Sequence, residues 1–222
     1  MPTTNLYTDE FYGDSADSYR SAKKYAEFLT KFYQPNTVVD VGCGRGAWLQ
    51  AFKDAGAQEC VGIDGEWNTQ ANMFNPEIKF QAQDLNQPIT VDRRFDLAIS
   101  VEVAEHLEPT ADFTFVDSLT LLSDVIVFGA AFIRQGGQHH IHEQYHTHWA
   151  QMFTSCGYQV FDCFRPAFWG DDEVCWWYQQ NTFLYVKQER ATDFIAQGLQ
   201  PLTNRKFMNC VHPYLYAQKT DQ

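Results

Sequence analysis

Apolar positions follow two alternating periodicities along the 222 residues. Short runs rich in β-branched and aromatic residues predict strands, and stretches with apolar side chains three and four positions apart predict amphipathic helices between them. Strands that alternate with helices form sheets covered on both faces, so we predict a doubly wound, Rossmann-like α/β sheet. The seven predicted strands cover residues 37–41, 59–63, 78–82, 95–100, 125–131, 158–165 and 181–187.

The helices are predicted from their one-sided apolar faces. The first starts near Ser18, the second covers 47–55 and stops at Gly56, the third follows Pro109, and the fourth ends at Gly157. The residues expected to face inward are Tyr25, Phe28, Leu29 and Phe32 in the first helix, Trp48, Leu49 and Phe52 in the second, Phe113 and Val116 in the third, and Trp149, Met152, Phe153 and Cys156 in the fourth.

The turn after the first predicted strand carries the first chemical signal. Asp40 ends the strand, and Gly42, Gly44 and Gly46 follow at alternate positions. Glycines allow positive φ and let a ligand lie against the backbone, as a nucleotide-type cofactor requires. Asp64 ends the second apolar run, a position from which a carboxylate accepts hydrogen bonds from ribose hydroxyls.

The D-V-G-C-G-R-G stretch from Asp40 to Gly46 resembles the first motif of class I S-adenosylmethionine (SAM) methyltransferases, E/D-x-G-x-G-x-G. The G-x-G-x-x-G spacing of hydride-transferring enzymes is absent. The resemblance implies SAM as cofactor and a seven-stranded, mostly parallel sheet with an antiparallel last strand. It also implies that Asp84 accepts from the adenine amino group. The cofactor residues implied are Asp40, Gly42, Gly44, Gly46, Asp64, Gly65, Asp84, Leu85, Val101 and Glu102.

The E-V-A-E-H segment after the fourth strand has two interpretations. With a later histidine it resembles small-RNA 2′-O-methyltransferases and ubiquinone-pathway O-methyltransferases, whose E-x-x-E-H motif binds a Mg²⁺-type metal. This resemblance implies Glu102, Glu105, His106 and His140 as ligands of a divalent cation, which would lower the pKa of an acceptor hydroxyl. Many metal-free SAM enzymes carry a similar motif, in which the first Glu lines the cofactor pocket. Both interpretations stay open.

Five of the seven histidines lie between residues 139 and 148. From about residue 11 onward the chain resembles bacterial methyltransferases found with polysaccharide and natural-product biosynthesis, whose pattern includes H-[I/V]-N-E-Q, Y-W, R-P and W-W-Y-x-Q-N. Departures are His142, where Asn is usual, and His148, where an aromatic residue is usual. The resemblance implies His140 as general base or metal ligand, with Glu143 and His106 as further catalytic residues.

The aromatic stretch between the last two strands is the predicted acceptor site. Flat aromatic faces bury the apolar face of a sugar ring, while amide groups bind its hydroxyls. The alternative is that these aromatic residues form a core cluster. The predicted acceptor residues are Trp169, Trp176, Trp177, Tyr178, Gln180 and Asn181, and Tyr12 or Tyr19 is expected to close over the cofactor.

Composition narrows the classes of partner. A net charge of −12 argues against a nucleic-acid partner, which requires a basic surface. The six cysteines form no C-x-x-C pair, the N-terminus has no signal-peptide pattern, and the longest apolar run, 125–133, is too short to span a bilayer. We therefore expect free thiols, a cytoplasmic location and no membrane span.

We divide the chain into an N-terminal cap segment (1–34), a SAM-binding domain (35–188) with acceptor-side insertions at 134–150 and 165–181, and a C-terminal tail (189–222). The predicted function is SAM-dependent O-methylation of a hydroxyl on a saccharide or sugar-bearing natural product. Alternatives are N- or C-methylation of a small metabolite, a non-catalytic SAM-binding regulatory partner, and a protein whose histidines serve only to bind metal.

Overall fold

A single seven-stranded sheet organises the computed structural model, which describes residues 15–220. The strand order is β3-β2-β1-β4-β5-β7-β6, and only β7 runs antiparallel to its neighbours. This confirms the predicted Rossmann-like architecture with its antiparallel last strand. The strands are β1 (Thr37–Val41), β2 (Glu59–Asp64), β3 (Lys79–Ala82), β4 (Leu97–Val101), β5 (Val125–Gly129), β6 (Tyr158–Phe161) and β7 (Thr182–Lys187).

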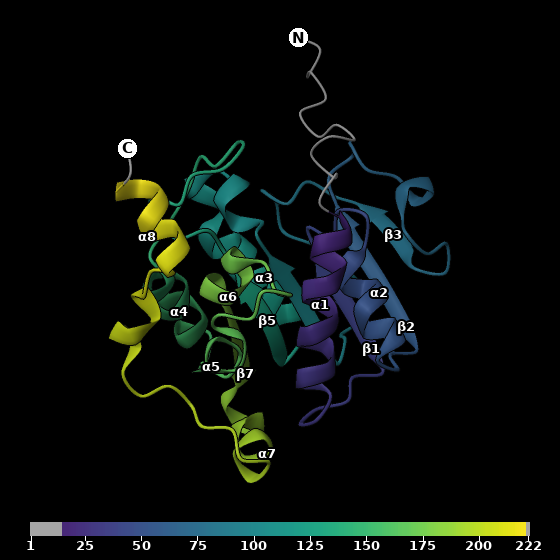
Figure 1. Ribbon diagram of the computed structural model, residues 1–222. Helices are drawn as coiled ribbons and strands as arrows, with labels where there is room; N and C mark the ends of the chain where they lie inside the picture. The colour runs from purple at the N-terminus through teal and green to yellow at the C-terminus, as the bar shows by residue number, and fades with distance from the viewer. Residues whose placement is uncertain (1–14, 221–222) are drawn as a thin grey trace.

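Helices cover both faces of the sheet (Figure 1). One apolar cluster joins α1, α2, α5, α6 and α7 to one face, and another joins α3 and α4 to the other. The helices are α1 (Ser15–Leu29), α2 (Ala47–Asp54), α3 (Asp112–Leu122), α4 (His146–Ser155), α5 (Phe164–Phe168), α6 (Trp176–Asn181), α7 (Ala191–Ala196) and α8 (Pro213–Thr220). None of the helices within 15–220 is long and apolar enough to cross a membrane.

The central strands explain why this order places the site where it does. Every residue of β4 and β5 is buried, and Leu97 and Ala98 belong to opposite clusters, as alternation along a strand between two helical layers requires. The parallel strands β1, β2 and β4 therefore end at one edge of the sheet. At that edge Asp40 is the last residue but one of β1, Asp64 ends β2 and Glu102 follows β4.

Two local predictions are wrong. The strand predicted over 158–165 ends at Phe161, and α5 begins at Phe164. Phe113, expected to face inward, has 60% of its surface exposed, whereas Phe115 is fully buried. The helix α3 begins at Asp112, after a short 3₁₀ turn over Pro109–Ala111. Its buried face runs through Phe115, Val116 and Leu119, and this face leaves Phe113 toward solvent.

We expect Phe115→Ala to lower the free energy of unfolding by about 3–5 kcal/mol, because it empties a packed site between α3 and the sheet. Phe113→Ala, in the same helix, is the matched control and should change it by less than about 0.5 kcal/mol. Urea unfolding followed by circular dichroism measures both. Equal losses would contradict the helical phase described here.

Candidate active site

The glycine turn after β1 needs glycine for steric reasons. Gly42 has φ +82°, and a Cβ on it would lie 2.3 Å from a Cγ of Val103. Gly44 also has positive φ. Gly46, with φ +84°, starts α2 and packs against Met73, so it shapes the turn without lining a cavity. The turn lets the backbone of Gly42 and Gly44 form an open floor.

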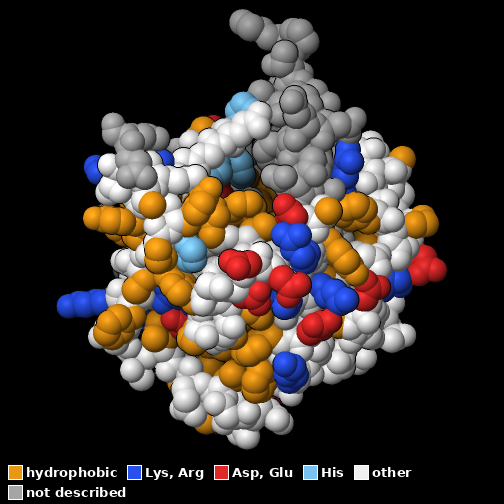
Figure 2. Space-filling view, viewed as in Figure 1, with side chains coloured by type: hydrophobic (Ala, Val, Ile, Leu, Met, Phe, Trp, Pro, Cys, Tyr) orange, Lys and Arg blue, Asp and Glu red, His pale blue; other side chains and the backbone are white. Residues whose placement is uncertain are grey.

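Two adjoining cavities lie over this floor. The acidic cavity, of about 620 Å³, is lined by Asp64, Gly65, Asp84 and Leu85 among others. The aromatic cavity, of about 410 Å³, is lined by Asp40, Val101, His140, Trp176, Trp177 and Tyr178 among others. Gly42, Gly44, Glu102 and His106 line both cavities. Their sizes suit small ligands, and Figure 2 shows histidine side chains at a hollow near the upper edge of the molecule.

Asp64 is held by the backbone of the glycine turn. It is almost fully buried, and its two carboxylate oxygens accept hydrogen bonds from the amides of Gly44 and Gly65, each at 2.7 Å. Burial raises the pKa of Asp64 to about 7, against the opposing effect of these amides. Asp40 is also buried, and burial together with the nearby Asp64 raises its pKa well above the ordinary value.

Asp84 has a different environment. It is exposed, and its Oδ1 accepts from the backbone amide of Asn86 at 3.0 Å and from the side-chain amide of Asn86 at 3.2 Å. This is an Asx turn, which orients the carboxyl group while leaving its other oxygen for a ligand in the acidic cavity.

A buried amide network holds Glu102. This residue has a left-handed backbone at φ +57°, uncommon for a non-glycine side chain and frequent at functional sites. Its carboxylate accepts from Asn181 Nδ2 at 2.9 Å and from Gln135 Nε2 at 3.3 Å. Gln180 Nε2 donates to Oε1 of Gln135 at 3.1 Å and to Oδ1 of Asn181 at 3.0 Å. The structure therefore places the Gln180 and Asn181 side chains behind Glu102, and not on the wall where they were expected to bind acceptor hydroxyls.

Two histidines face a fully buried carboxylate. The ligand atoms of Glu105, His106 and His140 lie within 4.8 Å of one another, and neither carboxylate oxygen of Glu105 has a hydrogen-bond partner among the described residues. Burial first, and then the charge of Glu102, raise the pKa of Glu105 well above the ordinary value. Glu102, expected to be a fourth metal ligand, is not part of this group, and its two oxygens accept from the Gln135 and Asn181 amides.

The hydrogen bonds of the two imidazoles indicate which nitrogen carries the proton. His140 Nδ1 lies 2.9 Å from the carboxylate of Glu143, and His106 Nδ1 lies 3.2 Å from the carbonyl of His139. In each neutral ring Nδ1 then donates, and in His140 this leaves the Nε2 lone pair as an acceptor. His140 Nε2 is 4.0 Å from Glu105. Burial, and then the adjacent His140, lower the pKa of His106 to about 4, so His106 is neutral near pH 7.

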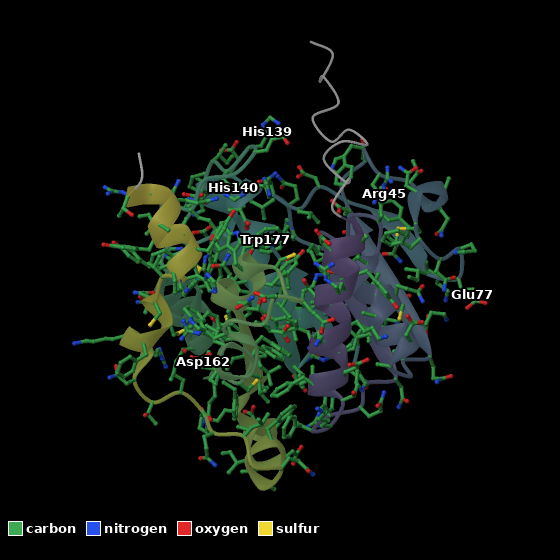
Figure 3. All side chains as sticks on the ribbon, viewed as in Figure 1. Arg45, Glu77, His139, His140, Asp162 and Trp177 are labelled. Atoms are coloured by element: carbon green, nitrogen blue, oxygen red, sulfur yellow. The ribbon has the colours of Figure 1, made fainter. Side chains whose placement is uncertain are left out.

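The aromatic wall is built by α6. Trp176 and Trp177 meet nearly at right angles, with ring centroids 5.7 Å apart, and both line the aromatic cavity with Tyr178. In Figure 3, Trp177 and His140 lie to the left of α1 and Arg45 lies to its right. Trp169, the remaining predicted wall residue, is partly exposed and packs against His212 outside the cavity lining.

The C-terminal tail reaches this wall. His212 and Tyr214 contact the ring of Trp176, at centroid distances of 6.3 and 5.4 Å. Arg165, paired with Asp162, donates to the carbonyls of residues 207 and 208, each at 2.8 Å, and so fixes the tail against the domain.

A family comparison decides the class of protein. Residues 14–188 match the family model described as a methyltransferase domain, which is more than half of the chain. The chain belongs to the methyltransferase domain family.

Solved structures share the fold of this methyltransferase at low sequence identity. DesVI of Streptomyces venezuelae is 15% identical over 81% of this chain and 96% of its own, with a TM-score of 0.58. The plantazolicin methyltransferase BpumL, in complex with S-adenosylhomocysteine (SAH), is 15% identical over 80% of this chain and 87% of its own, with a TM-score of 0.55. Human N-acetylserotonin methyltransferase, in complex with SAM, is 16% identical over 79% of this chain and 57% of its own, with a TM-score of 0.52. No curated protein matches the chain.

The protein is thus a methyltransferase. Sequence reasoning missed three residues that line the aromatic cavity, Ser18, Phe74 and Gln135. Gln135 also donates a hydrogen bond to Glu102. No motif or spacing marks these positions. Tyr19, expected to close over the cofactor, instead donates to Asp54 of α2 at 2.6 Å, and Tyr12 lies outside the described residues.

Proposed function

We propose that this methyltransferase methylates a hydroxyl group on a saccharide or a sugar-bearing natural product. One observation carries the proposal: the glycine turn, the imidazole of His140 and the indoles of Trp176 and Trp177 line the same cavity. A methyl donor resting on the turn and an acceptor resting on the indoles would meet beside the imidazole.

The residues around the acidic cavity fit the adenosyl part of SAM. The carboxylate of Asp64, already fixed by two backbone amides, would accept from ribose hydroxyls, and Asp84 from the adenine amino group. SAM supplies a sulfonium methyl group for in-line displacement. The protein's part is to align the acceptor oxygen with that methyl group and to remove the acceptor's proton.

His140 is the proposed general base. Glu143 holds its Nδ1, and the same carboxylate oxygen accepts from the amide of Gly136 at 2.6 Å, so the carboxylate is itself fixed. This leaves Nε2 to take the proton of an acceptor hydroxyl in the aromatic cavity. The arrangement resembles a base oriented by a carboxylate, in which the second residue fixes the tautomer of the first.

A divalent cation at Glu105, His106 and His140 is the second candidate. Neither oxygen of the buried Glu105 carboxylate has a hydrogen-bond partner among the described residues, and such a carboxylate is costly unless it is protonated or neutralised. With ring nitrogens of His106 and His140, whose ligand atoms lie within 4.8 Å, it offers a mixed O and N donor set. Carboxylate or carbonyl partners on the far side of both rings are typical of metal-binding histidines. A cation held there would lower the pKa of the acceptor hydroxyl.

The domain division stays part of this proposal. Residues 35–188 would bind SAM, with 134–150 and 165–181 on the acceptor side, and residues 189–222 would support the aromatic wall through the contacts of His212 and Tyr214.

We expect SAM affinity to rise between pH 6 and pH 8 and to level off above. The pKa of Asp64 is about 7, so its ionised form, which accepts from the ribose, is the minor form at pH 6. Affinity should be about tenfold lower at pH 6 than at the plateau. Isothermal titration calorimetry across this range measures it, and Asp64→Asn should bind weakly with no such slope. A flat profile for the unaltered protein would contradict this role of Asp64.

Product analysis tests the function itself. With methyl-¹³C SAM and a panel of saccharides and glycosides, we expect a labelled O-methyl product by NMR. A labelled N- or C-methyl group would support the alternative of a small-metabolite methyltransferase. SAM binding without product from any acceptor, and with no effect of altering His140, would favour a regulatory partner.

A further inference from the structure

A second group of metal-type ligands lies away from the proposed chemistry. Nε2 of His142 and Nε2 of His148 lie 2.9 and 2.7 Å from the same oxygen of Asp112. The other oxygen of Asp112 is buried and has no hydrogen-bond partner among the described residues. All the ligand atoms lie within 4.8 Å of one another.

Three different segments build this group. Asp112 is the first residue of α3, His148 lies in the first turn of α4, and His142 belongs to the loop between β5 and α4. Asp112 and His142 are nearly buried, whereas about a third of the His148 side chain is exposed. A cation bound here would join two helices and a loop while remaining reachable from solvent.

The two histidines converge on one carboxylate that lies 30 and 36 residues away in sequence.

We propose that Asp112, His142 and His148 form a divalent transition-metal site of the Zn²⁺ type, separate from the cluster at Glu105. Two imidazoles and one carboxylate match the donors that Zn²⁺ prefers, and water would complete the coordination. In a tetrahedral site neighbouring ligand atoms are about 3.3 Å apart, so the observed contacts need to open by only a few tenths of an ångström. Each Nε2 would then give up its proton and the ring would carry it on Nδ1.

The site would also fix the loop that carries His140. The amides of Ile141 and His142 both donate to the carbonyl of Glu105 at 3.0 Å. His140 and His142, two residues apart, thus contact the two different clusters. A cation at Asp112 would hold this loop two residues away from His140, and it would do so whatever the acceptor is.

The test uses the full chain after removal of metals by a chelator, with Co²⁺ and Zn²⁺ as probes. All measurements use the His140→Ala protein, which lacks one ligand of the Glu105 cluster. Metal binding by this protein therefore reports on the Asp112 site. We expect one equivalent of Co²⁺ with visible absorption typical of four-coordination. The additional substitution His148→Ala, or His142→Asn, should weaken binding at least about 100-fold.

His139→Asn is the matched control, since His139 lies in the same loop, is exposed and has a left-handed backbone that Asn tolerates. It should keep full affinity. A Zn²⁺ concentration about 100 times Kd should raise the Tm of the His140→Ala protein by about 5–10 °C and leave the His140→Ala/His148→Ala protein unchanged. Circular dichroism confirms that each variant is folded.

Two results would overturn the proposal. One is the absence of Co²⁺ and Zn²⁺ binding in the folded His140→Ala protein. The other is binding that survives both His148→Ala and His142→Asn. Either result would leave Asp112 as an acceptor of two imidazole N–H hydrogen bonds that tie α3 to α4 and to the loop before α4.

Discussion

Replacing His140 with alanine is expected to lower kcat by about 10²- to 10⁴-fold, the contribution of a positioned proton acceptor. The affinity for SAM should change less than about threefold, because the residues proposed to hold the adenosyl group lie in the acidic cavity, which His140 does not line. Single-turnover kinetics with a saccharide acceptor, together with calorimetry for SAM and SAH, measures the two quantities separately.

Two controls separate the possible roles of His140. Glu143→Gln keeps the shape beside Nδ1 but weakens the orientation of the ring, so its loss should be smaller than that of His140→Ala. If Mg²⁺ or Mn²⁺ stimulates the unaltered enzyme and Glu105→Gln abolishes the stimulation, His140 acts as a ligand more than as a base. Full activity of His140→Ala would remove both roles.

Gly42→Ala is expected to raise the Kd for SAM about 100-fold or more, equivalent to about 2.7 kcal/mol. A methyl group on Gly42 would meet two Cγ atoms of Val103 at 2.3 and 2.6 Å, and alanine is strained at φ +82°. The turn must shift to relieve both, and the turn is the shared floor of the two cavities. Calorimetry with SAM measures the effect.

Gly157→Ala supplies the matched control for the backbone strain. Gly157 has φ +83°, but a Cβ there makes only ordinary contact with Lys187, far from either cavity lining. Both variants should lose stability, and only Gly42→Ala should lose SAM affinity. Adding Val103→Ala to Gly42→Ala removes the two Cγ contacts, leaves the Cβ of residue 103 at 3.0 Å, and should restore part of the binding. An affinity for SAM in Gly42→Ala close to that of the unaltered protein would contradict the proposed floor.

Sequence reasoning succeeded where the signal is local. The run ending at Asp40 and the glycines after it specify a strand and a turn within ten residues, and β1 begins and ends where the pattern predicted. Burial on both faces makes β5 apolar throughout, so it too was visible. The prediction failed at Phe113, which lies just after the 3₁₀ turn that precedes α3, because local geometry there decides which side chains face the sheet.

The site could be predicted only in part, because side-chain direction depends on distant partners. Asn181 and Gln180 stand beside the tryptophans in sequence, yet they point inward, since Glu102 and Gln135 offer bonds there from 79 and 45 residues away. For the same reason the motif could not tell that the Glu105 oxygens have no hydrogen-bond partner among residues 15–220, while those of Glu102 accept from two amides.

The support that His212 and Tyr214 give to Trp176 bears on how relatives should be compared. The family match ends at residue 188, so these two rings come from a stretch that the shared domain does not include. If Trp176 contacts the acceptor as proposed, we expect enzymes that share the glycine turn to differ in acceptor through these terminal residues as well. Exchanging residues 189–222 between two such enzymes would redirect their choice of acceptor without touching the methyl donor.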